Sequence, residues 1–187
     1  MITVQEISAG LYGAWRLAQG DKSGRAYFNA SAQGAKRSFY AALIALPITT
    51  VLLFLDFSHR EIDAPAARVA LVFLLAFALD WAAFPLVVLR LTPMMGCDTH
   101  ILRYISALNW ARILEPVILM PAAMASVLGA QGLGTLLSLI LVITVLVYYW
   151  FVAKIALEVT GPQAAFLVGL NFVMGIIISI LAVSIIQ

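Results

Sequence analysis

The sequence predicts an all-α integral membrane protein: a five-transmembrane-helix bundle preceded by an N-terminal amphipathic helix. Three observations support this fold class. Hydrophobic residues make up 64% of the 187 residues and charged residues only 11%, whereas about a quarter of the residues in a soluble domain are charged. The mean hydropathy is +1.04. The apolar residues also gather in five runs, each long enough for the ~20 residues that cross a bilayer as a helix.

Residues 1–37 are predicted to form a cytoplasmic arm. Within it, residues 3–19 place Val4, Ile7, Leu11 and Trp15 at helical spacings of three or four. Such an amphipathic helix lies either in the lipid headgroup region, with Trp15 as an interfacial anchor, or on the protein's own cytoplasmic face. Both alternatives stay open at the level of the sequence.

Residues 38–187 are predicted to form a single transmembrane domain, with spans at residues 38–57, 66–91, 101–128, 136–157 and 163–186. A glycine-rich, uncharged stretch at residues 129–134 is expected to be the hairpin between the third and fourth spans. The fourth span ends in an aromatic belt with a cation beside it, and these interfacial anchors are Tyr148, Tyr149, Trp150 and Lys154.

Lysine and arginine counts near the span ends predict the orientation. With the N-terminus inside, eight basic residues fall on the inner side: Arg16, Lys22, Arg25, Lys36, Arg37, Arg90, Arg103 and Lys154. The outer side then holds only two, Arg60 and Arg68. Because cytoplasmic loops carry the excess of positive charge, we expect a multi-pass protein of a bacterial inner membrane with a cytoplasmic N-terminus and a periplasmic C-terminus.

An intramembrane polar cluster is predicted from Asp80, Asn109, Arg112 and Glu115. A charge in a bilayer costs at least ~2.5 kcal/mol, so such residues usually face a partner or a wet cavity. Asp80 lies roughly 15 Å of helix before the inner end of its span, and Arg112 lies about 14 Å after the same surface on the next span. Because Glu115 follows Arg112 by three residues, both share one helix face.

Three interpretations of this cluster remain open. It is a structural clamp between helices, with Asn109 adding a hydrogen bond; or a proton relay or substrate site in a transport path; or a groove for a partner's transmembrane helix. A network of Asp80, Arg112 and Glu115 has one excess negative charge. We therefore expect one carboxyl group to be protonated, because desolvation disfavours its charged form.

Small residues on the fifth span predict a helix-packing face. They are Ala165, Gly169, Gly175 and Ser179, with Asn171 nearby. Small residues four apart let helices approach closely in membranes. We expect this face to pack inside the bundle, with a dimer contact as the alternative.

Several kinds of chemistry are not expected. Cys97 and His100 have the spacing of half a zinc site, but no second pair accompanies them, so no metal is predicted. The glycine-rich stretch lacks the lysine of a phosphate loop. No pairing of a nucleophile with a base appears at membrane depth, so the chain is not expected to be an enzyme or to need a cofactor. No basic stripe suggests a nucleic acid partner.

Three segments carry a family resemblance: FNASAQGAKRSFYAALIALP at residues 28–47, RYISALNW at 103–110 and YYWFVAKIAL at 148–157. With the five-span layout and the N-terminal arm, the chain resembles the Yip1 family, in particular small bacterial Yip1-like membrane proteins. The resemblance covers most of the chain after residue 27. It implies a non-enzymatic role in membrane organisation or partner recruitment, and no catalytic residues carry over. Eukaryotic members include small GTPases among their partners.

The sequence thus predicts a scaffold or accessory protein of Yip1-like type. Its expected partners are the lipid bilayer and other membrane or membrane-associated proteins, with a homo-oligomer as an alternative. The competing prediction is a small transporter, or an ion- or proton-coupled membrane protein, that uses Asp80, Arg112 and Glu115.

Overall fold

A computed structural model describes residues 2–57, 64–94, 96 and 98–187 of the chain. Every regular element in these residues is a helix. Five helical segments are long and apolar enough to cross a membrane, which confirms the predicted fold class. They are Ala32–Phe57, Ala66–Met94, Ile101–Val127, Gln131–Ala156 and Gly161–Ile186. Cys97 and the charged loop at 58–63 lie outside the described residues.

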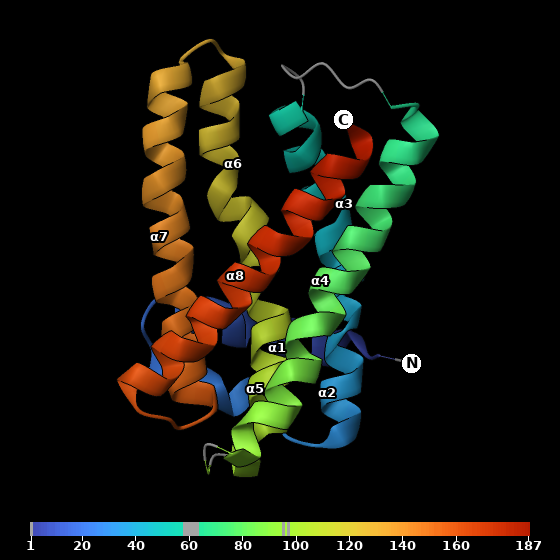
Figure 1. Ribbon diagram of the computed structural model, residues 1–187. Coiled ribbons are helices and arrows are strands. Elements are labelled where there is room, and N and C mark those ends of the chain that lie inside the picture. The colour runs from blue at the N-terminus through green and yellow to red at the C-terminus, as the bar shows by residue number, and fades with distance from the viewer. Residues whose placement is uncertain (1, 58–63, 95, 97) are drawn as a thin grey trace.

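The helices run up and down between two ends of the molecule (Figure 1). Helix α3 (Tyr40–Phe57) packs on α6 (Leu114–Val127), and α6 forms a hairpin with α7 (Gln131–Ala156). Helix α8 (Gly161–Ile186) crosses the bundle obliquely, contacting both α7 and α4 (Ala66–Met94) (Figure 1). The C-terminus and the α6–α7 turn lie at one end of the molecule, which we call the C-terminal end.

We call the opposite end the N-terminal end. It holds a compact lobe. It comprises α1 (Val4–Ala18), the 3-10 helix η1 (Lys22–Tyr27) and α2 (Ala32–Ser38), packed on α5 (Ile101–Ala111). The short helix η2 (Asp98–His100) lies at this end as well (Figure 1). The segments predicted to be cytoplasmic therefore share one end of the molecule. Which side of a membrane that end faces stays a prediction.

A helix occupies the predicted N-terminal position, and the predicted stripe is buried only in part. Ile7 and Leu11 pack against the core, whereas the two ends of the stripe are exposed. Thr3 and Glu6 form a capping box at its start. The buried residues include Gly10, Ala14 and Leu17, whereas Val4 is 82% and Trp15 54% exposed. A Cβ at Gly10 would overlap the ring of Trp110 on α5. The small residues face the bundle because only they allow this close approach.

The third span is two helices rather than one. Helix α5 ends at Ala111 and α6 begins at Leu114, and Arg112 and Ile113 form a turn between them, the α5–α6 break. Their backbone dihedrals stay helical, but the Ile113 N–H donates to the Trp110 carbonyl, three residues back, in place of the regular α-helical bond. Pro116 has no N–H and cannot donate to the Arg112 carbonyl, which accepts instead from the Glu115 N–H at 3.3 Å. Proline thus places a charged residue at a bend inside the bundle.

The turn between α6 and α7 is shorter than the predicted hairpin at 129–134. Helix α7 already begins at Gln131, so Gly132 and Gly134 are helical. A Cβ at Gly134 would overlap the Ser126 hydroxyl of α6, whereas one at Gly132 would meet nothing within 4 Å. Gly134 therefore serves close packing of the two helices and not chain reversal.

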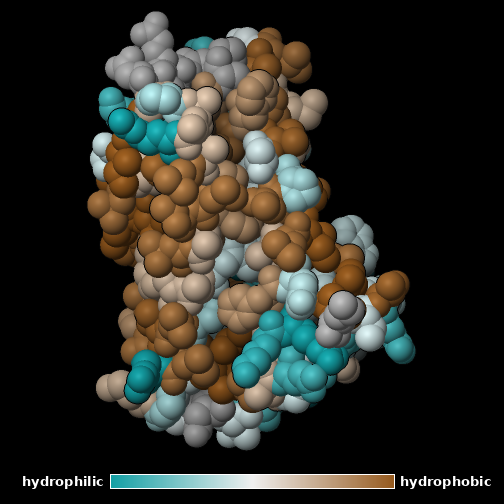
Figure 2. Space-filling view, turned by 90° about the vertical axis from the view of Figure 1, so that its right-hand side faces the viewer, coloured by the Kyte–Doolittle hydropathy of each residue, from teal (hydrophilic) through white to brown (hydrophobic). Residues whose placement is uncertain are grey.

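Packing differs between the two halves of the molecule. The buried core is centred on α5, where Tyr104, Leu108 and Trp110 are almost fully enclosed. Large side chains such as Leu75 and Ile180 are more than half exposed on the sides of the bundle. Figure 2 shows apolar residues as a broad band, with hydrophilic residues gathered toward the ends. The helices toward the C-terminal end are splayed (Figure 1). Two pockets of about 330 Å³ lie among these helices, and a smaller one of about 160 Å³ lies in the lobe beside Trp110.

An intramembrane polar cavity

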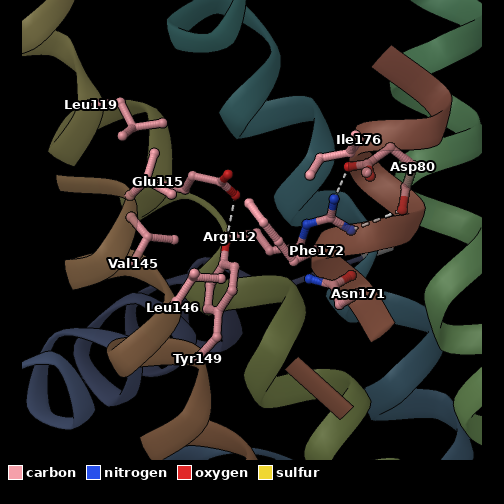
Figure 3. A pocket seen from close by; sticks show the side chains of 12 residues that line it. Asp80, Arg112, Glu115, Leu119, Val145, Leu146, Tyr149, Asn171, Phe172 and Ile176 are labelled. Atoms are coloured by element: carbon pink, nitrogen blue, oxygen red, sulfur yellow. Dashed lines mark hydrogen bonds and ion pairs between the residues drawn. The ribbon is translucent and has the colours of Figure 1, made fainter. Parts of the chain in front are cut away.

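A cavity of about 330 Å³ lies between α4, the α5–α6 break, α7 and α8. Its apolar lining includes Leu119, Val145 and Ile176 (Figure 3). Its polar lining comes from Asp80, Arg112, Glu115, Tyr149 and Asn171. Charged groups from separate helices thus converge on one space within the span-forming part of the bundle, as expected of a functional intramembrane site.

Asp80 and Arg112 form an ion pair between α4 and the α5–α6 break (Figure 3). Arg112 Nη2 donates to Asp80 Oδ2, and Nη1 donates to the Asp80 carbonyl oxygen at 3.1 Å. The guanidinium also stacks 4.7 Å from the ring centroid of Trp81. Arg112 is 6% exposed and Asp80 33%. The arginine is therefore enclosed by its partners, while the carboxylate still faces the cavity.

Glu115 does not join this pair, contrary to the three-residue network expected from the sequence. Its Oε2 accepts a hydrogen bond of 2.5 Å from the Tyr149 hydroxyl on α7 (Figure 3). Among the described residues, no cation lies within ion-pair distance of Glu115. The break at Arg112 turns the two side chains toward different helices, so the sequence spacing of three no longer keeps them on one face.

Helix α8 contributes a neutral polar wall. Asn171 points toward Arg112 from α8, and Phe172 lies beside it (Figure 3). One turn later Gly175 passes over Asp80, where an added Cβ would lie 3.6 Å from Asp80 Oδ1. Of the predicted packing face, Asn171 and Gly175 therefore border the polar cavity.

The other small residues of α8 are placed differently. Ala165 and Gly169 are exposed, and a Cβ at Gly169 would meet nothing within 4 Å. Ser179 is exposed and borders an apolar pocket between α3, α4 and α8. The predicted single face is thus divided, because the two-residue step from Gly169 to Asn171 turns a helix by about 200°.

Three further pockets adjoin the cavity, and we call the four together the vestibule. One shares Asp80, Arg112 and Glu115 with it. Another, of about 330 Å³, shares Leu119 and Val142 and extends to Ser126, Ser138 and Asp56. A third shares Asp80 and Gly175. The vestibule occupies the half toward the C-terminal end, whereas the lobe and α5 pack the other half.

Asn109 lies outside the polar cavity. It is fully buried, and its Nδ2 donates to the Ser38 hydroxyl on α2 at 2.9 Å. Ser38 in turn donates to the Ala35 carbonyl at 2.7 Å. The interhelical hydrogen bond expected of Asn109 therefore exists, but it joins α5 to the lobe and not to α4.

The predicted interfacial anchors separate into two kinds. Tyr148 and Tyr149 are 7% and 4% exposed, and Tyr148 donates to the Ala14 carbonyl of α1 at 3.0 Å. They face the protein interior because α1 and α6 cover that side of α7. Trp150 is partly exposed and donates to the Gly161 carbonyl at 2.9 Å, and Lys154 lies over its ring at 4.9 Å. Trp15, Trp150 and Lys154 alone remain on the surface.

A second charged cluster closes the N-terminal end. Glu158 follows α7 with a φ of 59°, a conformation that is uncommon for a residue other than glycine. Its carboxylate accepts from Arg25 at 2.9 Å and Arg103 at 2.7 Å, and lies 3.3 Å from His100. The hydrogen bond from Arg103 lowers the pKa of Glu158, as do the nearby charges of His100 and Arg25. This cluster joins the lobe to both α5 and α7.

Comparison with known protein families, with curated proteins and with solved structures finds no match to this chain. Within the described residues, no group of three or more histidine, cysteine, aspartate or glutamate side chains could hold a metal ion. The cavity instead offers a charge pair, a separate carboxylate and an amide.

Sequence reasoning did not assign three residues to this site in their observed roles. Trp81 stacks on Arg112, Tyr149 holds Glu115, and Asn171 forms part of the cavity wall. The position of Trp81 next to Asp80 is a usable signal, because a cation is attracted to an aromatic face. The sequence contains no comparable signal for Tyr149 and Asn171. The spacing of residues along a helix does not show which other helices pack against it.

Proposed function

We propose that the protein binds a small polar solute within the membrane and passes it across, with Asp80, Arg112 and Glu115 at the binding site. The observation that carries this proposal is the convergence of these side chains on a 330 Å³ cavity between apolar helices. Ligand sites are typically cavities of this size, apolar for the most part, with a few polar groups placed among apolar ones. Ionisable residues facing such cavities in membrane proteins usually mark a substrate or ion pathway.

The unequal packing of the two halves supports the same proposal. Toward the C-terminal end, the vestibule reaches from Glu115 to Ser126 and Ser138. Toward the N-terminal end, Tyr104, Leu108 and Trp110 fill the bundle. A site open to one side and closed to the other is what alternating access requires in one of its states. The α5–α6 break is the proposed hinge because the regular hydrogen bonding of the helix is interrupted there.

Solvent access to the vestibule tests this function. Leu119→Cys places a thiol where three of its pockets meet, and Leu139→Cys is the matched control on the outer surface of α7, where Leu139 is 62% exposed. Both are made with Cys97→Ser and treated with a water-soluble thiosulfonate in liposomes. We expect labelling at position 119 and little at position 139, because a thiol facing lipid stays protonated. Equal protection of both positions would show that the vestibule is not wet and would overturn the proposal.

A flux measurement then separates a wet cavity from a pathway. Proton entry into liposomes is followed with a pH-sensitive dye at an imposed membrane potential. If the site is coupled to protons, Glu115→Gln abolishes this flux, while Glu158→Gln, a carboxylate change outside the spans, leaves it unchanged. A Glu115→Gln protein that conducts like the parent excludes Glu115 from proton movement.

A second candidate, the Yip1-like scaffold, is favoured by a different observation. The lobe is held to the bundle by the Tyr148–Ala14 hydrogen bond and by Glu158, yet it presents Val4 and Trp15 outward. Exposed apolar residues on an ordered lobe suit recruitment of a membrane-associated protein or of a second copy. On this proposal the lobe faces the bacterial cytoplasm, and Asp80 with Arg112 only clamps the bundle.

Photocrosslinking in cells tests the scaffold. A photoreactive amino acid at Trp15 should give a discrete adduct of fixed mass, and the same group at Leu139 should give none. An adduct of twice the chain mass would indicate a homo-oligomer. Adducts at neither position, together with a labelled Leu119→Cys, would favour the transport function over the scaffold.

A further inference from the structure

We propose that the solute recognised in the polar cavity is a small organic cation of the ammonium type, and that Glu115 is the carboxylate that binds it. This inference rests on the proposed solute-binding function and names its substrate class. Four observations carry it: the charge balance of the cavity, the unused acceptors that face it, its aromatic lining, and its size.

The charge balance leaves Glu115 without a protein cation. The positive charge of Arg112 is committed to Asp80 by hydrogen bonds to its carboxylate and its carbonyl oxygen, and to Trp81 by stacking. Its side chain is only 6% exposed. Glu115 has the neutral Tyr149 hydroxyl as its partner. With all three groups ionised, the cavity holds one excess negative charge, and a bound cation would supply the partner that buried charges in proteins have.

Most of the polar atoms that face the cavity without a hydrogen-bond partner are acceptors. Among the described residues, Glu115 Oε1 and Asp80 Oδ1 have no hydrogen-bond donor, and Asn171 adds an amide oxygen from α8. A carboxylate offers two oxygens with about four lone-pair positions, so most of this capacity is free. Donors on an ammonium group would satisfy it, whereas an anion would meet two carboxylates.

The lining also suits the apolar body of an organic cation. Phe172 and Tyr149 border the cavity together with Leu119, Val145 and Ile176. Aromatic faces attract cations through their quadrupole, and the aliphatic residues pack on carbon atoms. The face of Trp81 is already occupied by Arg112.

The size of the cavity favours an organic cation over a bare metal ion. A metal such as Ca²⁺ or Mg²⁺ requires several oxygen ligands at about 2.0–2.6 Å. Within the described residues, no group of three or more histidine, cysteine, aspartate or glutamate side chains offers such a set. A volume of 330 Å³ is instead in the range of small-molecule pockets.

Among the described residues, Arg112 is the one cationic side chain that lines the pockets around Glu115. The groups that face Glu115 from the surrounding elements are Asp80 of α4, Arg112 of the α5–α6 break and Tyr149 of α7. Helix α8 adds Asn171, and α3 adds Thr49 to the adjoining pocket, both uncharged.

Equilibrium binding of radiolabelled benzylammonium, a primary ammonium with three N–H donors, to the full chain in detergent tests the inference. Three proteins are compared: the parent, Glu115→Gln, which keeps the side-chain shape, and Glu158→Gln, which removes a carboxylate at the N-terminal end. We expect saturable binding to the parent and to Glu158→Gln, and affinity lower by about tenfold or more in Glu115→Gln. Circular dichroism melting confirms that each variant is folded.

Radiolabelled benzoate serves as the anionic probe in the same assay. If benzoate binds and benzylammonium does not, the solute-binding function stands and its cation class is wrong. Equal affinity of the parent and Glu115→Gln for benzylammonium also overturns the inference, because Glu115 then does not hold the cation. If neither probe binds and Leu119→Cys resists labelling, both the cation class and the solute-binding function are contradicted.

Discussion

At the scale of single residues, the partners of Arg112 and Glu115 decide what the polar cavity can do. Two carboxylates and one guanidinium were expected to form one network. Instead Arg112 is held by Asp80 and Trp81, and Glu115 by Tyr149. The first arrangement stabilises the bundle, because a paired charge is far less costly in a bilayer than a single one. The second leaves a carboxylate available to a ligand.

The clamp between α4 and the α5–α6 break predicts the behaviour of charge deletions. Arg112→Leu leaves the Asp80 carboxylate unpaired, and removal of one partner of a buried pair costs about 3–5 kcal/mol. Because Asp80 is 33% exposed to the cavities, we expect a smaller loss, about 2 kcal/mol. This corresponds to a decrease in the melting temperature in detergent of roughly 5 °C.

The double variant Asp80→Leu, Arg112→Leu is the control. Two well-packed apolar side chains often replace a buried pair without loss of stability. We therefore expect it to melt closer to the parent than either single variant. Single variants that melt like the parent would show that the pair does not hold the fold.

Glu158 predicts a pH dependence at the N-terminal end. Its pKa is lowered chiefly by the hydrogen bond from Arg103, with His100 and Arg25 adding to the effect. The stabilisation is therefore fully present above the unfolded-state value of about 4.3, and is lost as the pH falls through the lower folded-state value. Hydrogen–deuterium exchange of the backbone amides of residues 22–27, corrected for intrinsic rates, should therefore become faster at these acidic pH values. Glu158→Gln should exchange faster already at neutral pH, and identical profiles for the two proteins would contradict this assignment.

At the scale of elements, proline and glycine place the helices that form the cavity. Pro116 interrupts the third span, and Gly134 allows α6 and α7 to approach closely. The break turns Arg112 toward α4 and leaves Glu115 facing α7. A continuous helix at the same place would keep both on one side, and the separate carboxylate would be lost.

Two glycines on α7 test this account with a matched pair of substitutions. In Gly132→Ala the new methyl group meets nothing within 4 Å, and alanine favours a helix over glycine by about 1 kcal/mol. In Gly134→Ala it overlaps Ser126 of α6, and overpacking costs typically about 1–3 kcal/mol. We expect Gly132→Ala to melt at or above the parent temperature and Gly134→Ala below it. The reverse order would show that α6 and α7 are not packed as described.

At the scale of the whole molecule, the two ends differ in both charge and packing. The lobe, η2 and Glu158 gather at one end, and the vestibule occupies the half toward the other. A protein with this asymmetry needs a defined orientation in the membrane. The distribution of lysine and arginine predicts that the lobe faces the cytoplasm.

Accessibility from the two sides of the membrane tests that orientation. Gln187→Cys and Lys22→Cys, each combined with Cys97→Ser, place thiols at the C-terminal end and on the lobe, at exposed positions. An impermeant maleimide applied to cells with a permeabilised outer membrane should label Gln187→Cys at once. Lys22→Cys should react only after lysis, and the opposite pattern would reverse the predicted topology.

The sequence by itself determined the class of this protein. Five apolar runs specify five spans because a bilayer requires about 20 apolar residues per crossing. Asp80 and Arg112 were also identified as partners, since their depths can be counted along helices. Both inferences depend on local composition and on distance along one helix, which the sequence contains directly.

Only the tertiary structure decided which face of each helix meets which neighbour. It turned Glu115 to Tyr149, directed Asn109 to Ser38, buried Tyr148 against α1 and left Gly169 outside the bundle. In a membrane segment that is apolar on all sides, periodicity does not mark the buried face, because lipid is as apolar as the core. The rotation of each helix is set by small residues, proline breaks and a few hydrogen bonds, and these act between elements far apart in the chain.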